Sequence, residues 1–374
     1  MTRLADLPNL IRPDIADLEA YTPILPLDVL AERLHLPVES LVKLDANENP
    51  YGPAPAALAA LANEAHYAIY PDPEHTALRR ALSDFIGQPI ERILCGAGAD
   101  EVIDLLLRVV LQPGDSVIDC PPTFGMYAFD TAINAGRRIV VPRRADFSLD
   151  LPALGQAVVT HRPKVLFIAS PNNPSGNATP LAELVQLLQL PVLVVVDQAY
   201  IEFTDPMYDA LDLLGQHENL VVLRTFSKWA GLAGLRIGYG VMHAQLATHL
   251  WKIKQPYNVN QAALVAALAA LHDSEHLPQS IAAIVAERER LIAAVQSLGW
   301  LQPYPSQANF VLCRVTDAAG KPAPARAAQT YQHLQQQGIL VRYYRKPDLH
   351  DCLRISVGTP AQHERLLAAL RAMG

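Results

Sequence analysis

Short apolar runs rich in branched residues alternate with amphipathic segments from about residue 75 to residue 245. Such runs are typical of buried strands, and the segments between them have the periodicity of helices. The expected strands are Arg92–Cys95, Ser116–Cys120, Arg138–Val141, Val165–Ala169, Val192–Val196, Leu220–Leu223 and Ile237–Val241, with helices such as Asp100–Leu111 and Leu181–Gln189 between them. This alternation predicts an α/β fold with a mainly parallel, doubly wound sheet and helices on both faces.

The pattern differs on either side of this region. Residues 1–45 are rich in proline and contain one expected helix, Leu27–Leu34, so we interpret them as an N-terminal arm that packs against the small domain or a partner subunit. We expect a large domain over residues 46–275 and a smaller α+β C-terminal domain over residues 276–374. The elements expected in the smaller domain are Ser280–Leu298, Asn309–Val315, Ala325–Gln337, Ile339–Tyr344, Leu353–Val357 and Ala361–Met373.

Composition argues against several classes of protein. A net charge of −7 disfavours nucleic acid or an anionic membrane as the main partner. No apolar run approaches the roughly 20 residues that span a membrane, and the N-terminus lacks the apolar core of a signal peptide. The four cysteines form no CxxC pair, which predicts a reducing cytoplasm and no zinc site. The twelve histidines are scattered, so we expect no metal.

A lysine follows one of the expected strands, in the segment Arg224-Thr-Phe-Ser-Lys-Trp-Ala-Gly-Leu-Ala-Gly-Leu-Arg236. Lys228 comes just after Leu220–Leu223, a place that suits a Schiff base with a cofactor aldehyde better than core packing. Ser227 and Arg236 would then hold the phosphate of that cofactor. On this segment alone, a surface lysine after a strand is an equally good interpretation.

Polar motifs follow other strands as well, and ligands of such sheets bind at the carboxyl ends of the strands. The run Leu94-Cys-Gly-Ala-Gly-Ala-Asp-Glu101 leads through glycines into a helix, where the backbone N–H groups of Ala99 and Asp100 form an anion cradle. Half or more of such turns merely pack, and the spacing is not that of a dinucleotide site. Ser170-Pro-Asn-Asn-Pro-Ser-Gly-Asn177 is at least a rigid turn, and its fixed amides can also donate to a ligand oxygen.

An aspartate, Asp197, ends the apolar strand in the segment Val194-Val-Val-Asp-Gln-Ala-Tyr200. Burying Asp197 is costly unless it meets a cation, and a protonated pyridine nitrogen is such a cation. Tyr200 is then placed to reach the phenolic oxygen of the same ring. Earlier in the chain, Asp45-Ala-Asn-Glu-Asn-Pro-Tyr-Gly-Pro53 has the composition of a turn with an unusual density of polar groups.

The motifs occur in a fixed order over almost the whole chain: Tyr70-Pro-Asp-Pro, Gly98-Ala-Asp-Glu, Pro121-Pro-Thr-Phe-Gly-Met-Tyr, Asn172-Asn-Pro-Ser-Gly, Asp197-Gln-Ala-Tyr-Ile-Glu-Phe, Ser227-Lys and Leu353-Arg-Ile-Ser-Val-Gly-Thr. In this order they closely resemble the histidinol-phosphate aminotransferases, which are pyridoxal-phosphate (PLP) enzymes of the aspartate-aminotransferase fold, fold type I. The resemblance implies transamination of L-histidinol phosphate with 2-oxoglutarate, giving imidazole-acetol phosphate and glutamate, in L-histidine biosynthesis.

The same resemblance implies roles for individual residues. It assigns the cofactor to Ala99, Asp100, Phe124, Asn173, Asp197, Tyr200, Ser227, Lys228 and Arg236, with Tyr70 donated by the other subunit of a homodimer. It assigns the substrate to Tyr21, Asn173, Tyr257, Arg342 and Arg354. Lys228, Asp197 and Tyr200 are the implied catalytic residues. Gln198 and Ser175 depart from the Glu and Thr frequent in the family, and Phe124 replaces a common tyrosine.

Other functions fit parts of the sequence. An aromatic-amino-acid aminotransferase and a lyase like the PLP-dependent threonine-phosphate decarboxylase are the nearest alternatives. A PLP-binding regulator would need a DNA-binding module, and the first 45 residues are too short and too rich in proline for one. A nucleotide-binding protein without PLP would leave Lys228, Asp197 and Tyr200 without a role.

Overall fold

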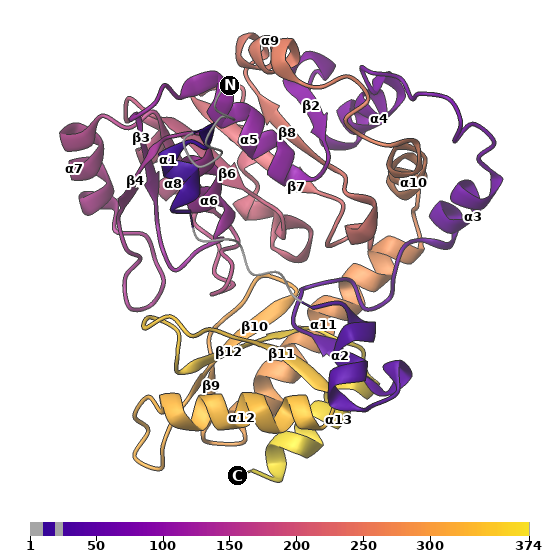
Figure 1. Cartoon of the computed structure of the whole chain (residues 1–374), viewed down its shortest axis with the longest axis vertical. Helices are drawn as coiled ribbons and strands as arrows, with labels where there is room; N and C mark the ends of the chain where they lie inside the picture. The colour runs from indigo at the N-terminus through magenta and orange to yellow at the C-terminus, as the bar shows by residue number, and fades with distance from the viewer. Residues whose placement is uncertain (1–9, 19–24, 374) are drawn as a thin grey trace, which may run out of the picture.

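The computed structural model describes residues 10–18 and 25–373, whose strands form a seven-stranded and a five-stranded sheet (Figure 1). The α-helices are α1 (Pro13–Ala16), α2 (Leu27–Leu34), α3 (Pro55–Asn63), α4 (Thr76–Ile86), α5 (Ala99–Val110), α6 (Met126–Ile133), α7 (Leu151–His161), α8 (Leu181–Leu188), α9 (Ala244–Ile253), α10 (Gln261–Leu271), α11 (His276–Gln296), α12 (Pro324–Gln336) and α13 (Pro360–Arg371). None of these helices is long and apolar enough to cross a membrane.

The larger sheet has the order β2-β8-β7-β6-β5-β3-β4. Its strands are β2 (Ile93–Gly96), β3 (Ser116–Asp119), β4 (Arg137–Val140), β5 (Val165–Ala169), β6 (Leu193–Asp197), β7 (Leu220–Thr225) and β8 (Gly238–Met242). Strand β8 runs antiparallel to both its neighbours, and the other pairs are parallel. The prediction of a mainly parallel sheet is confirmed.

Burial on both faces of this sheet explains the continuous apolar runs of its strands. On β6, Val194 and Val196 pack into the core cluster that includes residues of α3, α4, α7, α8 and α10. Val195, between them, points into the opposite cluster with residues of α5, α6 and α9. A strand covered on both faces has no polar alternation, which is the signature of a doubly wound sheet.

The smaller sheet has the order β1-β11-β12-β10-β9, with the strands β1 (Val42–Leu44), β9 (Leu301–Pro303), β10 (Phe310–Val315), β11 (Ile339–Tyr343) and β12 (Cys352–Ser356). Strand β1, which the sequence did not predict, pairs in parallel with β11 and so carries the end of the expected arm into this sheet. On β12, Leu353 and Ile355 pack against the cluster of α11, α12 and α13. Because strand side chains alternate, Arg354 and Ser356 lie on the opposite face. The boundaries at residues 45 and 275 stay a prediction.

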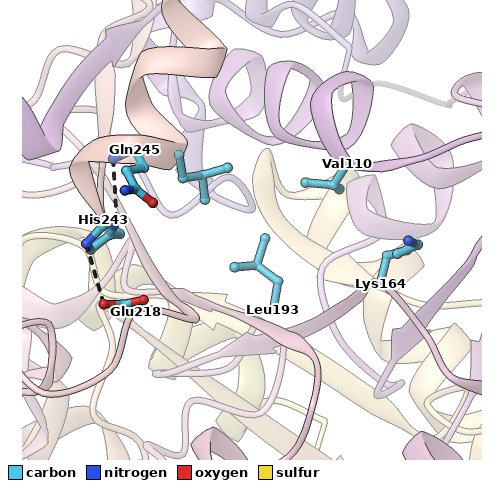
Figure 2. A pocket seen from close by; sticks show the side chains of 7 residues that line it. Val110, Lys164, Leu193, Glu218, His243 and Gln245 are labelled. Atoms are coloured by element: carbon cyan, nitrogen blue, oxygen red, sulfur yellow. Dashed lines mark hydrogen bonds and ion pairs between the residues drawn. The ribbon is translucent and has the colours of Figure 1, made fainter.

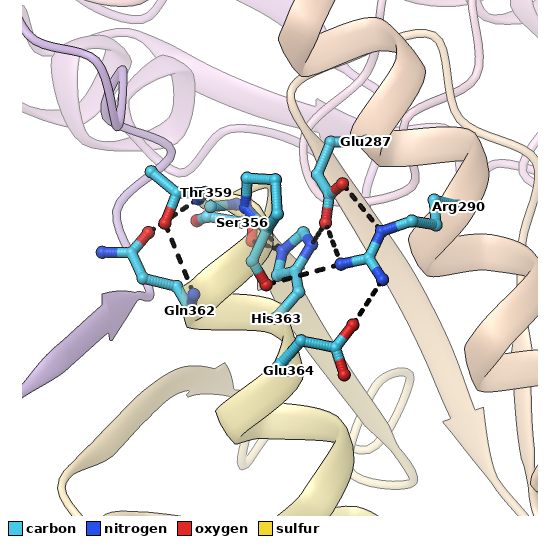
Figure 3. Close-up of polar contacts among 9 residues, drawn as sticks. Glu287, Arg290, Ser356, Thr359, Gln362, His363 and Glu364 are labelled. Atoms are coloured by element: carbon cyan, nitrogen blue, oxygen red, sulfur yellow. Dashed lines mark hydrogen bonds and ion pairs between the residues drawn. The ribbon is translucent and has the colours of Figure 1, made fainter.

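A buried histidine fixes the turn that follows β12 (Figure 3). The backbone N–H of Gly358 donates to Nε2 of His363 at 2.9 Å, so Nε2 carries no proton and Nδ1 donates to Glu287 of α11. Arg290 binds both carboxylate oxygens of Glu287, at 2.7 and 2.8 Å. The network joins α11 to α13 and holds the end of the strand that carries Arg354.

Candidate active site

Lys228 lies three residues beyond the end of β7 and is partly buried. Its Nζ donates to the carbonyl oxygen of Ala46 at 3.2 Å and lies 5.9 Å from the ring centroid of Tyr200. Burial, followed by the charge of Arg354, lowers the pKa of Lys228 to about 8. A lysine with such a pKa has a substantial neutral fraction near neutral pH, which a nucleophilic amine needs.

Asp197 is the last residue of β6, the strand next to β7. Its Oδ2 accepts a hydrogen bond from the hydroxyl of Tyr127 at 2.7 Å, and its Oδ1 accepts one from the backbone N–H of Ala199 at 3.0 Å. Burial raises the pKa of Asp197 to about 6. The side chain is therefore oriented by two donors, and a cation bound beside it would lower its pKa and be held strongly.

Tyr200 is buried three residues beyond the end of β6, and its hydroxyl accepts hydrogen bonds from two side-chain amides. Nδ2 of Asn47 donates to the hydroxyl oxygen at 3.1 Å and Nδ2 of Asn173 at 3.4 Å. Burial raises the pKa of Tyr200 to about 12, so the hydroxyl stays protonated at neutral pH. Since both amides donate to its oxygen, the phenolic hydrogen remains to be given to an acceptor.

An anion cradle forms where β2 leads into α5. Gly98 precedes α5 with a φ of +82°, and a Cβ on it would lie 2.6 Å from Nη2 of Arg236. Nη2 of Arg236 also bonds Asp100 at 2.9 Å. A Cβ on Gly238 would lie 2.5 Å from the backbone nitrogen of Ala99. Glycine at both positions lets a guanidinium and the N–H groups of a helix start approach one point, as a phosphate site requires.

Ser227 and Phe124 are two further residues predicted to bind the cofactor. Ser227 is buried beside Lys228, and its Oγ accepts a hydrogen bond from Thr225 at 2.9 Å, which leaves its own hydrogen to donate. Phe124 packs edge to face on Tyr127, with ring centroids 5.6 Å apart. The ring of Phe124 is thus in contact with the side chain that orients Asp197.

Arg354 reaches from the small sheet to the loop after β5. Its Nη1 donates to Oδ1 of Asn173 and its Nη2 to the carbonyl oxygen of Asp45, both at 2.6 Å. The Nε atom is buried and has no hydrogen-bond partner among the described residues. Arg342 is the register partner of Arg354 on β11, so the two side chains lie on the same face of the sheet.

Two of the predicted tyrosines lie apart from this cluster, on the surface. Tyr70 is 78% exposed and stacks on Tyr257, which is 41% exposed, with ring centroids 4.6 Å apart. Neither ring forms a hydrogen bond with Lys228 or with the anion cradle of its own chain. Tyr21, predicted for the substrate, lies outside the described residues.

Two residues of the site were missed by the sequence analysis. Tyr127 belongs to the motif that supplied Phe124, but its bond to Asp197 spans 70 positions. Asn47 belongs to the polar turn after β1, where its φ of +56° is one that asparagine tolerates better than most residues. That turn chemistry was the available signal, and it did not point to the hydroxyl of Tyr200.

A hollow of about 450 Å³ lies elsewhere, at the opposite edge of the large sheet (Figure 2). It is lined by Val110, Lys164, Leu193, Glu218, His243, Gln245 and Leu246. These residues lie just before β5 and β7, at the start of β6, at the end of α5, and between β8 and the first turn of α9, whereas Asp197 ends β6 and Lys228 follows the carboxyl end of β7. The hollow therefore belongs to the edge without the predicted chemistry.

The fold and the site together define a transferase in which a lysine bonds a phosphorylated aldehyde cofactor. One edge of the doubly wound sheet carries a buried carboxylate, a tyrosine hydroxyl, an anion cradle and a lysine whose pKa is lowered. The family model for aminotransferase class I and II matches residues 39–370 of the chain. The chain belongs to this family.

Similar proteins carry a more specific name. A histidinol-phosphate aminotransferase from Roseiflexus castenholzii is 57% identical, over 98% of this chain and 99% of that protein. A chloroplastic histidinol-phosphate aminotransferase from Nicotiana tabacum is 47% identical, over 96% of this chain and 86% of that protein. The crystal structure of a histidinol-phosphate aminotransferase from Sinorhizobium meliloti in complex with pyridoxal-5′-phosphate has a TM-score of 0.88 at 29% identity, covering 100% of this chain and 99% of that chain.

Proposed function

We propose that this chain is a PLP-dependent transaminase that converts L-histidinol phosphate and 2-oxoglutarate to imidazole-acetol phosphate and glutamate, in L-histidine biosynthesis. The observation that carries the choice of substrate is the register pairing of Arg342 with Arg354 beside the site. Two guanidinium groups on one face suit a phosphate dianion, which accepts several charge-assisted hydrogen bonds. The names of the relatives, 57% and 47% identical, support the same substrate.

The residues present fit PLP. Its phosphate suits the N–H groups of Ala99 and Asp100, the guanidinium of Arg236 and the hydroxyl of Ser227, at a point that a Cβ on Gly98 would obstruct. The ring nitrogen suits Asp197, and the ring face suits Phe124. When bound, PLP supplies an aldehyde for the amino group and a ring that draws electrons from the reacting Cα.

Lys228, Asp197 and Tyr200 would each act on a different part of the reacting group. Lys228 would hold the cofactor through its aldehyde, and its Nζ, once free, would move the proton at the substrate Cα. The negative charge of Asp197 would keep the ring nitrogen protonated. Tyr200 and Asn173 would donate hydrogen bonds to the ring oxygen. The same groups would serve the half-reaction with 2-oxoglutarate.

We further propose that the enzyme is a cytoplasmic homodimer in which Tyr70 reaches the cofactor phosphate of the partner subunit. The exposure of Tyr70 and of the apolar side chains Leu58, Tyr67 and Ile69 supports an interface there, since large apolar groups gathered on a surface favour association. All four cysteines are free and buried, which is consistent with a reducing compartment.

A steady-state comparison of amino donors tests the proposal. We expect kcat/KM for histidinol phosphate to exceed that for histidinol by at least about 10²-fold, because a site built for a polar group rejects its absence. Phenylalanine, tyrosine and glutamate serve as competing donors in the same assay. The substrate assignment would change to an aromatic-amino-acid aminotransferase if the enzyme preferred phenylalanine or tyrosine, or used histidinol and its phosphate equally.

A further inference from the structure

A buried lysine outside the predicted site joins two segments that carry the exposed tyrosines. Lys254 follows α9 and is 8% exposed. Its Nζ donates to the carbonyl oxygen of Pro73 at 3.0 Å, to that of Gln255 at 3.1 Å and to Oδ1 of Asn258 at 2.9 Å. All three N–H groups of the ammonium are therefore used, and the side chain has one defined position.

The two tyrosines lie within a few residues of these bonds. Tyr70 precedes Pro73 by three positions, and Tyr257 lies between Lys254 and Asn258. Tyr257 has a φ of +60°, a backbone conformation that an aromatic residue rarely adopts and that its surroundings must maintain. The bonds of Lys254 fix both segments, and the two rings stack at 4.6 Å.

A second set of bonds connects the same segments to the anion cradle of the same chain. Nδ2 of Asn258 donates to Oε2 of Glu101 at 2.6 Å. That oxygen also accepts the backbone N–H of Ala97 at 2.6 Å, in the loop between β2 and α5. A continuous path therefore runs from the Tyr70 segment through Lys254, Asn258 and Glu101 to the loop that precedes Ala99.

We propose that Lys254 is a positioning residue that holds the Tyr70–Tyr257 pair for the active site of the partner subunit, while Asn258 and Glu101 connect this pair to the cradle of its own chain. The inference rests on the proposed function, in which Tyr70 contributes to the partner's cofactor phosphate. Its consequence is directional. Loss of Lys254 weakens the site in the partner more than the site in the same chain, because the cradle keeps its bond to Asn258.

Hybrid dimers separate these two effects. Two chains with different affinity tags are co-expressed, and dimers carrying both tags are purified. One chain carries Lys228→Ala, so only the other chain can bond the cofactor covalently. Lys254→Met is placed either in the Lys228→Ala chain, where it acts on the competent site from the partner, or in the chain with the competent lysine. Lys252→Met in the Lys228→Ala chain is the matched control, since Lys252 is an exposed lysine in the last turn of α9, two residues before Lys254.

The readouts are the dissociation constant of PLP, from the absorbance of the lysine-bound cofactor, and KM and kcat for histidinol phosphate. With Lys254→Met in the partner, we expect the dissociation constant to rise about 10-fold, the scale of one lost hydrogen bond to a charged group. With Lys254→Met in the chain that keeps Lys228, and with Lys252→Met, we expect dissociation constants and kinetic constants within about twofold of those of the parent hybrid. Such changes are usual for a substitution that does not touch the site directly. The proposal is overturned if Lys254→Met weakens PLP binding equally or more when it is in the chain that keeps Lys228.

A second variant covers the case in which Lys254→Met prevents assembly, and the parent hybrid tests the shared site itself. If the Lys254→Met chain does not assemble, Lys254→Gln, which retains a donor amide, is used in the same two arrangements and the same comparison decides. A chain that forms no dimer, or that bonds PLP at another lysine, overturns both the shared site and the role of Lys254. That result is recognised in the parent hybrid, before Lys254 is changed, and so is distinguished from failure of the positioning role alone.

Discussion

The guanidinium of Arg354 donates to the side-chain oxygen of Asn173 at 2.6 Å and thereby joins the small sheet to the large one. Because the amide oxygen of Asn173 faces Arg354, its NH₂ group faces the hydroxyl of Tyr200, 3.4 Å away. The residue predicted to grip the substrate therefore also sets the orientation of a residue predicted to bind the cofactor ring. Its charge is also the second cause, after burial, of the lowered pKa of Lys228.

Removal of Arg354 is expected to change the pH at which Lys228 reacts. The pKa of Lys228 is lowered to about 8, so its amine becomes neutral as the pH rises through that value. Arg354→Leu removes a positive charge that favours the neutral form, and the rate at which PLP bonds to the cofactor-free chain should then rise only at higher pH. Arg365→Leu, at an exposed arginine of α13, is the control and should leave the profile unchanged. An unchanged profile in Arg354→Leu would contradict the electrostatic link.

Lys228 is expected to be the single lysine that bonds the cofactor. Borohydride reduction of the PLP-loaded protein, followed by peptide mass spectrometry, should place the pyridoxyl group on Lys228. Lys228→Ala should still bind PLP, but its proton-transfer rate should fall by more than the ~10²–10⁴-fold typical of a general acid–base group, since the covalent role is lost as well. Label on another lysine would end this assignment.

Two substitutions around Asp197 are expected to differ in severity. Asp197→Asn should fold and bind PLP more weakly, with a much larger loss in kcat, because a neutral amide does not keep the ring nitrogen protonated. Tyr127→Phe removes only the 2.7 Å hydrogen bond and should cost about 10-fold in kcat, the scale of one hydrogen bond to a charged group. Turnover measured on both PLP-loaded variants tests the order, and near-normal turnover in Asp197→Asn would refute the pairing.

Below pH 6, cofactor binding should weaken in the unmodified protein. Burial raises the pKa of Asp197 to about 6, so the carboxylate gains a proton as the pH falls through that value and loses the charge that attracts the ring nitrogen. The dissociation constant of PLP, measured by absorbance from pH 5 to pH 8, should therefore rise on the acid side. Asp197→Asn serves as the control, since its affinity should be low and lack this acid limb.

Much of the fold was predictable because its signals are local. Both faces of the large sheet are covered, so strands such as β6 are continuous apolar runs with a polar residue at the end. The order of the strand-end motifs then pointed to Lys228 and Asp197. Strand β1 was missed because three residues beside a proline-rich stretch carry too little periodicity to be distinguished from a turn.

The contacts between the sheets were not predictable from local patterns. The bond from Asn47 to Tyr200 spans 153 positions, and the bond from Arg354 to Asn173 spans 181. Such pairs depend on how the two sheets are placed, which periodicity and turn chemistry do not encode. Arg342 and Arg354 are an intermediate case. The resemblance assigned both to the substrate, and the antiparallel register places them directly opposite each other although they are twelve positions apart in the sequence.

The Glu287–His363 pair should make the C-terminal region sensitive to acid. Burial lowers the pKa of His363, so the unfolded chain binds a proton near pH 6.5 that the folded chain resists. Stability is therefore complete above pH 6.5 and decreases as the pH falls below it. His363→Leu should reduce the free energy of unfolding by about 1–3 kcal/mol at neutral pH, because it leaves the buried N–H of Gly358 without its partner and removes one hydrogen bond of Glu287.

Urea unfolding at several pH values measures both effects. The matched control is Glu364→Gln on the same helix, where an exposed carboxylate pairs with Arg290 at 2.6 Å. An exposed pair contributes about 0–1 kcal/mol, so this variant should remain close to the parent protein. If His363→Leu had the same stability and the same pH dependence as the parent protein, the buried pair would not be responsible.

Arg342 should govern the discrimination between histidinol phosphate and histidinol. It faces the same side of the small sheet as Arg354, and its guanidinium lies 5.9 Å from the ring centroid of Tyr344. Arg342→Ala removes one of two cations proposed to bind the phosphate. We therefore expect kcat/KM for histidinol phosphate to fall about 10-fold or more, the cost of a lost charge-assisted hydrogen bond, while that for histidinol changes little. Arg371→Ala, at an exposed arginine at the end of α13, controls for the loss of charge. Equal losses for both substrates would show that Arg342 supports the fold of the site without contacting the phosphate.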